Sequence, residues 1–431
     1  MDATGSADKS TVQGLSSYRW YVFSILCFGY FLVYFHRLAP AVVAVEMMRD
    51  LTAGGALMGL LGAAYFYPYA LMQLPSGLLA DSWGARKTIS LFMCLAATGS
   101  LVFALAPSVG WAIAGRSLVG VGVAMLFVST LKVLTEWFDP REFATMTGYL
   151  FVVGGIGSLA SAAPLAWFSN WFGWRMVFVG IAGFTLMLAI LVWLVVRDRP
   201  DPEGLGVQCC DAGSSRQAVT LWAGVRTVLA CRHFWPLAVW FFALCAIFFS
   251  FGGLWGGPYL QHVYAMDRAA AGSVLSMLSV GMIIGSPLLT WLSNRVFKAR
   301  KPVLVLCSIL SCLITLILVL WTAELTVGLL MTLCLCMGAF TSAVVVIGFA
   351  ATKELFPISI AGTSIGLVNL FPFVGGAVMQ PLLGTVLENG GKVDGIFTVT
   401  AYRQAFVVLL GCALVALVAS LVVREPDLII N

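Results

Sequence analysis

Long apolar segments run through the whole chain and limit what it can fold into. A helix needs about 20 apolar residues to cross a bilayer, and twelve segments are long and apolar enough to do so. They lie near residues 20–44, 56–80, 88–107, 109–133, 144–168, 174–196, 234–262, 269–294, 302–322, 325–352, 361–387 and 403–423. Inside a bilayer every backbone polar group must be hydrogen-bonded within the protein. The sequence therefore predicts an all-α membrane protein with twelve transmembrane helices.

Composition excludes the other broad classes of protein. The 431 residues are 61% apolar and 10% charged, whereas ordinary globular chains are roughly 45–50% apolar and about 25% charged. The 24 basic and 19 acidic residues are too few to cover this apolar surface in water. A soluble enzyme, a disordered chain and a fibrous protein are excluded, and nucleic acid is not expected as a partner.

The sequence also lacks the motifs of enzymatic and metal chemistry. No phosphate-binding loop of the Gly-Lys-Ser/Thr type is present, so direct coupling to ATP is not expected. Most of the 11 cysteines are single residues inside apolar segments. Cys209-Cys210 and the pair Cys334/Cys336 have no His or Asp at metal-ligand spacing. We expect no catalytic residues, no bound metal and no cofactor.

A polar stretch divides the predicted helices into six and six. The longest one between helices, rich in Pro, Gly and Ser, runs from Arg197 to Arg232 and is typical of a linker. The predicted organisation has two tails, two bundles and a linker: 1–19 (cytoplasmic tail), 20–196 (first six-helix bundle), 197–233 (cytoplasmic linker), 234–423 (second six-helix bundle) and 424–431 (cytoplasmic tail).

The basic residues predict the orientation. With the N-terminus inside, 17 of the 24 Lys and Arg residues fall in inner loops and tails and five in outer loops, while Arg37 and Arg116 lie within helices. The five outer residues are Arg49, Arg175, Arg268, Lys392 and Arg403. Basic residues are enriched on the cytoplasmic side of membrane proteins. Both termini are therefore expected in the cytoplasm.

A weak internal repeat supports the division into halves. Glu136-Trp-Phe recurs 218 residues later as Glu354-Leu-Phe, and Trp174-Arg recurs 228 residues later as Tyr402-Arg. The extra ten residues fit a longer loop after the eleventh predicted helix. Parallel six-helix repeats are typical of transporters whose substrate binds near the midplane between the halves.

The loop after the second predicted helix carries a specific motif. It reads GLLADSWGARKT from Gly77 to Thr88 and resembles the signature of the major facilitator superfamily, with Gly77, Asp81, Gly84, Arg86 and Lys87 in place. A degenerate copy, TWLSNRVFKARK, has Asn294 in place of the acid, and the segment Arg116–Gly122 resembles a second family motif. The resemblance covers the whole chain and implies two pseudo-symmetric six-helix bundles.

The resemblance implies a gate on the inner side. Gly77 lets two helices approach closely, and Asp81 can pair with a basic residue or a helix N-terminus in the state that is closed inside. Lys132 and Glu136 are four residues apart and can pair, with a place on the cytoplasmic rim as the alternative for Lys132. Arg116 is expected to fix helix packing by bonding neighbouring carbonyls.

Arg37 is the sharpest candidate for a substrate contact. Its segment contains Gly29, Tyr30, Tyr34 and Arg37 and resembles the first helix of the organophosphate and organic-anion branch, in which the arginine binds the anionic group. A guanidinium suits carboxylate or phosphate oxygens. A structural arginine near the outer interface, or one paired with Glu46, is the alternative. The second arginine of the organophosphate antiporters, in the seventh helix, is missing, which favours a monoanion or a carboxylate.

Other polar and aromatic residues are candidates for the rest of the site. Tyr65, Tyr69 and Gln73 share one face of the second helix. Trp255 and Tyr259 lie beside Gly-Gly and Gly-Pro sequences, and such breaks can unwind a helix where they line a cavity. Asn369, Gln380 and His36 complete the set. Packing is the alternative for each aromatic residue, and a neutral, packed ring is the alternative for His36.

These observations predict a secondary transporter that moves a small organic anion, a carboxylate or a phosphorylated solute, by alternating access. Protons are candidates for coupling. A monomer in a bacterial inner membrane is expected. One alternative is a carrier of metal ions or chelates such as iron–siderophore complexes, although His36, Glu46 and His262 form no cluster at ligand spacing. The other is a sensor or assembly partner that binds a solute without transporting it.

Overall fold

The computed structural model describes residues 4–199, 221–357 and 360–424, and these are almost entirely helical. The first half contains α1 (Thr4–Leu38), α2 (Pro40–Asp50), α3 (Gly55–Trp83), α4 (Ala85–Ala104), α5 (Val109–Ala124), α6 (Leu126–Trp137), α7 (Pro140–Ala160) and α8 (Ala163–Val195). The second half contains α9 (Leu221–Ala230), α10 (Phe234–Ser250), α11 (Gly256–Tyr264), α12 (Arg268–Trp291), α13 (Lys301–Leu320), α14 (Val327–Met337), α15 (Val345–Glu354), α16 (Ala361–Val368), α17 (Leu370–Asn389) and α18 (Val399–Val422).

Most of these helices form twelve membrane spans. Eleven helices of the described chain are long and apolar enough to cross a membrane, and the apolar helix Thr145–Ala160 is shorter. Within α8, Gly173 has φ 75° and ψ 154°, a conformation that glycine adopts without steric cost. This turn separates 163–172, which continues the fifth span begun by α7, from the sixth span. The predicted twelve-helix fold is confirmed.

Several spans change helical geometry partway. Short π-helical segments, η2 (Phe251–Trp255), η3 (Leu292–Val296) and η4 (Gly338–Ala343), interrupt three of them. At the Gly-Gly and Gly-Pro sequences of the seventh span, which can unwind a helix, the chain stays helical. Residues 251–260 are buried, and the N–H of Gly256 bonds the carbonyl of Phe251. Buried backbone groups need partners, and a π-helical turn keeps them paired where an unwound segment would not.

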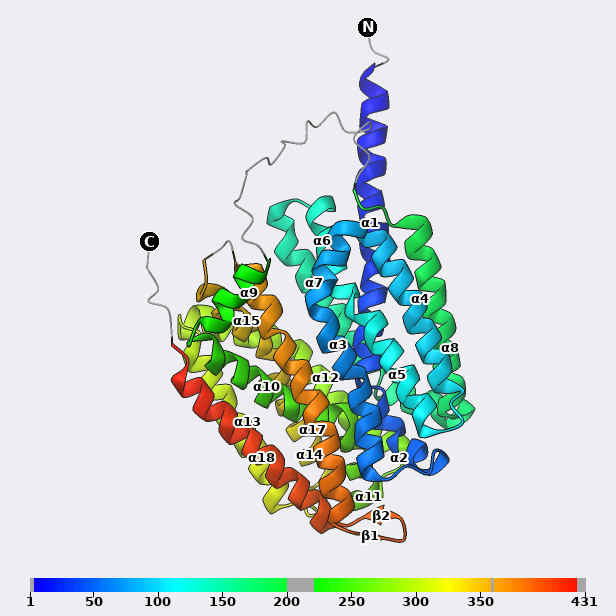
Figure 1. Cartoon of the computed structure of the whole chain (residues 1–431), viewed down its shortest axis with the longest axis vertical. Helices are drawn as coiled ribbons and strands as arrows, with labels where there is room; N and C mark the ends of the chain where they lie inside the picture. The colour runs from blue at the N-terminus through cyan, green and yellow to red at the C-terminus, as the bar shows by residue number, and fades with distance from the viewer. Residues whose placement is uncertain (1–3, 200–220, 358–359, 425–431) are drawn as a thin grey trace.

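The two halves of the chain stand side by side (Figure 1). We call the face at which α1 begins the N-terminal face, at the top of Figure 1, and the other the opposite face. A hairpin of β1 (Lys392–Val393) and β2 (Ile396–Phe397) lies on the opposite face, in the loop after the eleventh span that was predicted to be longer. Between the halves, α3 packs against α17, α2 against α11, and α7 and α8 against α12.

Glycines bring the two halves together near the opposite face. A Cβ on Gly257 of α11 would overlap the carbonyl oxygen of Ala41 in α2, and a Cβ on Gly59 of α3 would lie 2.6 Å from the Cα of Pro381 in α17. Gly55 and Gly384 make a similar backbone approach between α3 and α17. Small residues permit such close helix contacts in membranes.

The predicted tails and linker are only partly described. Residues 1–3, 200–220 and 425–431 lie outside the described part of the chain. Helix α1 already begins at Thr4, within the predicted tail 1–19, and α9 lies within the predicted linker 197–233. The boundaries of the bundles therefore remain predictions.

The contact between Gly257 and Ala41 is tested by Gly257→Ala. We expect the added methyl group to force the halves apart and to lower the free energy of unfolding by about 1–3 kcal/mol, as overpacking does. The matched control is Gly411→Ala in α18, where a Cβ meets no atom within 4 Å. Denaturant unfolding of the purified protein measures both, and equal stability of the two variants would contradict the assignment.

Candidate functional site

A small central cavity of about 80 Å³ lies between the two halves. The first half lines it with α1, α3, α6 and α7, and the second half with α10, η4, α15 and α17. Its lining residues are Tyr30, Tyr34, Arg37, Tyr69, Phe127, Phe151, Cys245, Phe248, Phe249, Ser342, Val345, Phe349, Asn369, Pro372 and Phe373. Five of the residues predicted from the sequence are thus brought together, namely Tyr30, Tyr34, Arg37, Tyr69 and Asn369.

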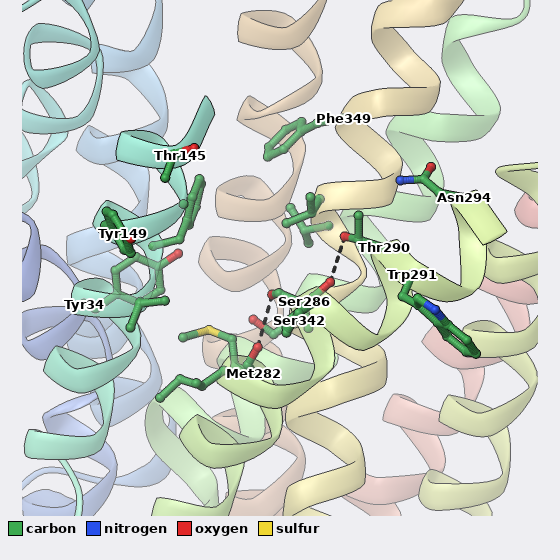
Figure 2. A pocket seen from close by; sticks show the side chains of 18 of the residues that line it. Tyr34, Thr145, Tyr149, Met282, Ser286, Thr290, Trp291, Asn294, Ser342 and Phe349 are labelled. Carbon is green, nitrogen blue, oxygen red and sulfur yellow. Dashed lines mark hydrogen bonds between the residues drawn. The ribbon is translucent and has the colours of Figure 1, made fainter. Parts of the chain in front are cut away.

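A larger cavity of about 700 Å³ adjoins the central one. The two share lining residues, including Tyr34 and Ser342. Figure 2 shows Tyr34 and Tyr149 on one side, with Met282 and Ser286 of α12 on the other. From Met282 to Asn294 the lining follows α12 and η3 for roughly 18 Å, at 1.5 Å per residue. Because η3 ends the span that begins at Arg268, the cavity extends towards the N-terminal face.

Arg37 is buried at the wall of the central cavity. It lies in the last turn of α1, next to the break before Pro40, and it is 6% exposed. Its guanidinium carbon lies 4.7 Å from the ring centre of Tyr34, 5.2 Å from Tyr69, 5.6 Å from Phe249 and 5.0 Å from Phe373. No carboxylate of the described residues forms an ion pair with Arg37. The cavity therefore carries a buried cation held among aromatic rings.

A second buried arginine packs behind this site. Arg116 donates from Nη1 to the carbonyl of His36 over 2.9 Å, and its guanidinium lies 5.0 Å from the ring centre of Tyr65. His36 is fully buried and is not a lining residue of either cavity. Because the contact with Arg116 uses the backbone of His36, it fixes the end of α1 on which Arg37 stands.

The remaining predicted site residues make packing contacts. Tyr65 donates to the carbonyl of Val33 over 3.3 Å, and Tyr259 to that of Thr322 over 2.7 Å. Trp255 donates to the carbonyl of Gln380 over 3.0 Å, while the amide of Gln380 donates to the carbonyl of Phe249 over 2.7 Å. Buried polar tips need such partners.

Gln73 stands next to the cavity instead of in its wall. Its Oε1 accepts a 3.0 Å hydrogen bond from the side-chain amide of Asn369, which does line the cavity. Gln73 belongs to α3 and Asn369 to the junction of α16 and α17. This bond therefore joins the two halves directly beside the central cavity.

The predicted inner gate is partly described. Gly77 and Asp81 lie in α3, but their side-chain environment is outside the described part of the structure. Gly84 has φ 84° and ends α3, which turns the chain into α4. The side chain of Lys132 donates to the carbonyl of Ala80 over 2.8 Å. Glu136 forms an ion pair with Arg199 at 3.4 Å.

Asp198, which follows α8, contacts the region of the predicted gate and was missed from the sequence. Its Oδ1 accepts a 2.7 Å hydrogen bond from the backbone N–H of Arg86, in the first turn of α4. The guanidinium of Arg86 lies 4.9 Å from the ring centre of Trp193, and Lys87 is exposed. A carboxylate is favourable at a helix N-terminus. Asp198 gave no signal in the sequence because an acid next to a basic loop usually faces water.

An ion pair joins the halves near the opposite face. Glu46 belongs to α2, and Arg268 is the first residue of α12. The carboxylate of Glu46 accepts a hydrogen bond from Arg268, with 2.8 Å between Oε1 of Glu46 and Nε of Arg268. The carboxylate of Glu388 in α17 accepts a 3.0 Å hydrogen bond from the N–H of Ala56 in α3. Glu46 is therefore engaged by Arg268, and a pair between Glu46 and Arg37, one alternative from the sequence, is not present.

Two six-helix halves around a central cationic cavity, joined near one face, define a secondary transporter that works by alternating access. Comparison with known proteins agrees. The profile of the Major Facilitator Superfamily matches residues 26–264 and 241–429, so the chain belongs to this family. No group of three or more His, Cys, Asp or Glu side chains that could hold a metal ion occurs among the described residues, and the comparisons give the metal-transport alternative no support.

Two curated relatives and one solved structure are similar to the chain. A probable galactarate/D-glucarate transporter of Bacillus subtilis (strain 168) is 23% identical over 96% of this chain and 95% of its own length. The hexuronate transporter of Escherichia coli (strain K12) is 26% identical over 69% of this chain and 72% of its own. A bacterial homologue of the human lysosomal transporter Spinster, inward-facing and unoccupied, has a TM-score of 0.72 at 19% identity, covering 94% of this chain and 97% of its own.

The ion pair between Glu46 and Arg268 is tested by reversing its charges. We expect Glu46→Arg and Arg268→Glu each to lower the free energy of unfolding, because each leaves two like charges in partly buried positions. The double reversal restores the pair and should recover about 0.5–3 kcal/mol, the usual coupling of residues in contact. Strictly additive effects in a double-mutant cycle would show that the pair does not join the halves.

The contact of Asp198 with α4 gives a separate prediction. Asp198→Ala removes the acceptor at the helix N-terminus, and loss of such a cap costs about 0.5–2 kcal/mol of stability. Asp198→Asn keeps an oxygen acceptor without the charge and should cost less. Unfolding of the three proteins by denaturant provides the measurement. The assignment fails if Asn and Ala are equally destabilising.

Proposed function

We propose that the protein transports a small organic anion and that Arg37 binds its anionic group. One observation carries this proposal: Arg37 is buried in a cavity between the two halves without a carboxylate partner among the described residues. Ionisable residues within spans are costly and usually functional. The names of the two curated relatives support it, because galactarate, D-glucarate and hexuronate are carboxylates.

We further propose that the N-terminal face is cytoplasmic. The excess of basic residues in the loops of this face favours the orientation, and the larger cavity extends towards it. The structure would then correspond to an inward-facing state in an inner membrane, with Gly77, Asp81, Gly84, Arg86 and Lys87 closing this side in the other state. Transport is expected from a monomer and is coupled to a gradient of the solute or of protons.

Arg37 is tested by uptake of anions into liposomes with the purified protein, comparing wild type, Arg37→Lys and Arg37→Ala. Loss of a charge-assisted hydrogen bond costs about 1.5–3 kcal/mol, so Arg37→Ala should weaken the apparent affinity for a carboxylate by roughly 10–150-fold. Arg37→Lys keeps the charge but not the planar fork and should fall between the two. The control is Arg403→Ala at an exposed position in α18.

The outcomes of this experiment are distinct. Uptake that depends on Arg37 and not on Arg403 supports the proposal. Unchanged uptake in Arg37→Ala would make Arg37 a packing residue. Binding of the anion by wild-type protein without any flux would favour the alternative of a sensor. Imposing a pH gradient during the same uptake shows whether protons are coupled.

A further inference from the structure

We infer that the transported anion is a monocarboxylate with an apolar, aromatic body and not a polyhydroxy acid. The inference rests on the proposed function, since it takes Arg37 as the partner of the carboxylate. It is drawn from the side chains of the central cavity that would surround the part of the solute beyond its carboxylate. It also departs from the sugar acids in the names of the two curated relatives.

The wall of the central cavity is dominated by aromatic rings. Six phenylalanines and three tyrosines make up nine of its fifteen lining residues. Four of these rings surround the guanidinium of Arg37 at 4.7–5.6 Å. A second group adjoins them: Tyr30 stacks on Phe127 at 5.4 Å, and Phe127 lies 5.7 Å from Phe151. Tyr34 joins the groups, because its ring lies 5.3 Å from that of Tyr30. Such a surface pairs well with an aromatic body.

The polar groups of this cavity belong to seven of its fifteen lining residues. Besides Arg37 and the tyrosine hydroxyls, the wall offers Asn369, Ser342 and the thiol of Cys245. The amide of Asn369 already donates to Gln73. A sugar acid brings four or five hydroxyl groups, each of which needs a hydrogen-bond partner once it is removed from water. Phenylalanine, valine and proline side chains, which make up the rest of the wall, offer such groups no partner, so we expect a sugar acid to bind more weakly than an aromatic acid.

The charge of the site selects one carboxylate. Arg37 is the cationic residue of the central wall, while Arg116 is occupied by the carbonyl of His36 and the ring of Tyr65. A second carboxylate in this cavity would be buried without a cation, which is strongly unfavourable. A dicarboxylate is therefore disfavoured within the central cavity, since the other lining cation, Arg295, belongs to the adjoining cavity.

The adjoining cavity leaves space for the body of the solute. Its lining beyond the shared residues includes the apolar side chains of Val152, Met282, Ile283 and Val346 near the central cavity. Polar side chains, those of Thr145, Tyr149, Ser286, Thr290, Asn294 and Arg295, also line it. With its carboxylate at Arg37, a ring on a short chain would reach from the central cavity into this space. A polar body would lose hydration along the same path.

The test measures binding by isothermal titration to purified wild-type protein with four probes. These are 3-phenylpropionate, the uncharged 3-phenylpropanol, D-gluconate and the dicarboxylate adipate. Binding is preferred to flux here, because the neutral form of an apolar acid crosses bilayers unaided. We expect 3-phenylpropionate to bind at least about tenfold more tightly than each of the other three. We expect Arg37→Ala to abolish that preference over 3-phenylpropanol.

A matched pair of variants tests the aromatic wall itself. Phe373→Leu removes a ring next to Arg37 and should weaken binding of 3-phenylpropionate several-fold, whereas Phe168→Leu, at an exposed position outside the central cavity, should not. An intact unfolding midpoint shows that each variant is folded. Equal binding by Phe373→Leu and wild type would overturn the inference.

Failure of the inference and failure of the proposed function look different. If D-gluconate or adipate binds as tightly as 3-phenylpropionate, and this binding needs Arg37, the inference is wrong and anion transport stands. If no anionic probe binds and none is taken up by liposomes, both are wrong. If 3-phenylpropanol binds as well as 3-phenylpropionate, Arg37 is not the partner of the carboxylate and both are wrong.

Discussion

The organisation of this protein depends on one buried cation. A guanidinium inside a membrane span is costly, and Arg37 has no carboxylate partner among the described residues to offset that cost. Four aromatic rings surround it instead, and cation–π contacts of this kind contribute about 0.5–2 kcal/mol each. Rings stabilise the charge without neutralising it. The aromatic wall is therefore the reason that Arg37 can be both buried and attractive to an anion.

The contacts that join the halves near the opposite face combine close glycine packing with a few polar bonds. Glycines such as Gly257 bring backbones together, Ser158 and Ser279 share a 2.6 Å hydrogen bond, and Glu46 pairs with Arg268. Individual hydrogen bonds are worth only about 0.5–1.5 kcal/mol net, so such a surface can separate without unfolding either half. The cores of the halves are apolar and extensive. Such a design permits the two halves to move as rigid bodies.

The sequence predicted the spans well because span length and apolar content are local properties. It predicted less about which side chains meet, since that depends on how the spans pack. Tyr65 and Tyr69 share a face of α3 at four-residue spacing, yet Tyr65 bonds the carbonyl of Val33 and only Tyr69 reaches the cavity. Phenylalanine gave no signal at all. Phe168, Phe178 and Phe249 all lie in apolar segments, but the first is exposed, the second is buried in packing and the third lines the cavity. The neighbouring residues in the sequence do not distinguish these three environments.

The rings around Arg37 come from both halves, which connects the site to the movement in the proposed cycle. Tyr34 and Tyr69 belong to the first half, and Phe249 and Phe373 to the second. In the proposed cycle the two halves change their relative position. Tyr34 and Tyr69 then move together with Arg37, whereas Phe249 and Phe373 move relative to it. A ligand shifts such an equilibrium only through different affinities for the two states. Because a solute at Arg37 would touch rings of both halves, its binding energy would change with their relative position, and this change is what couples occupancy to opening.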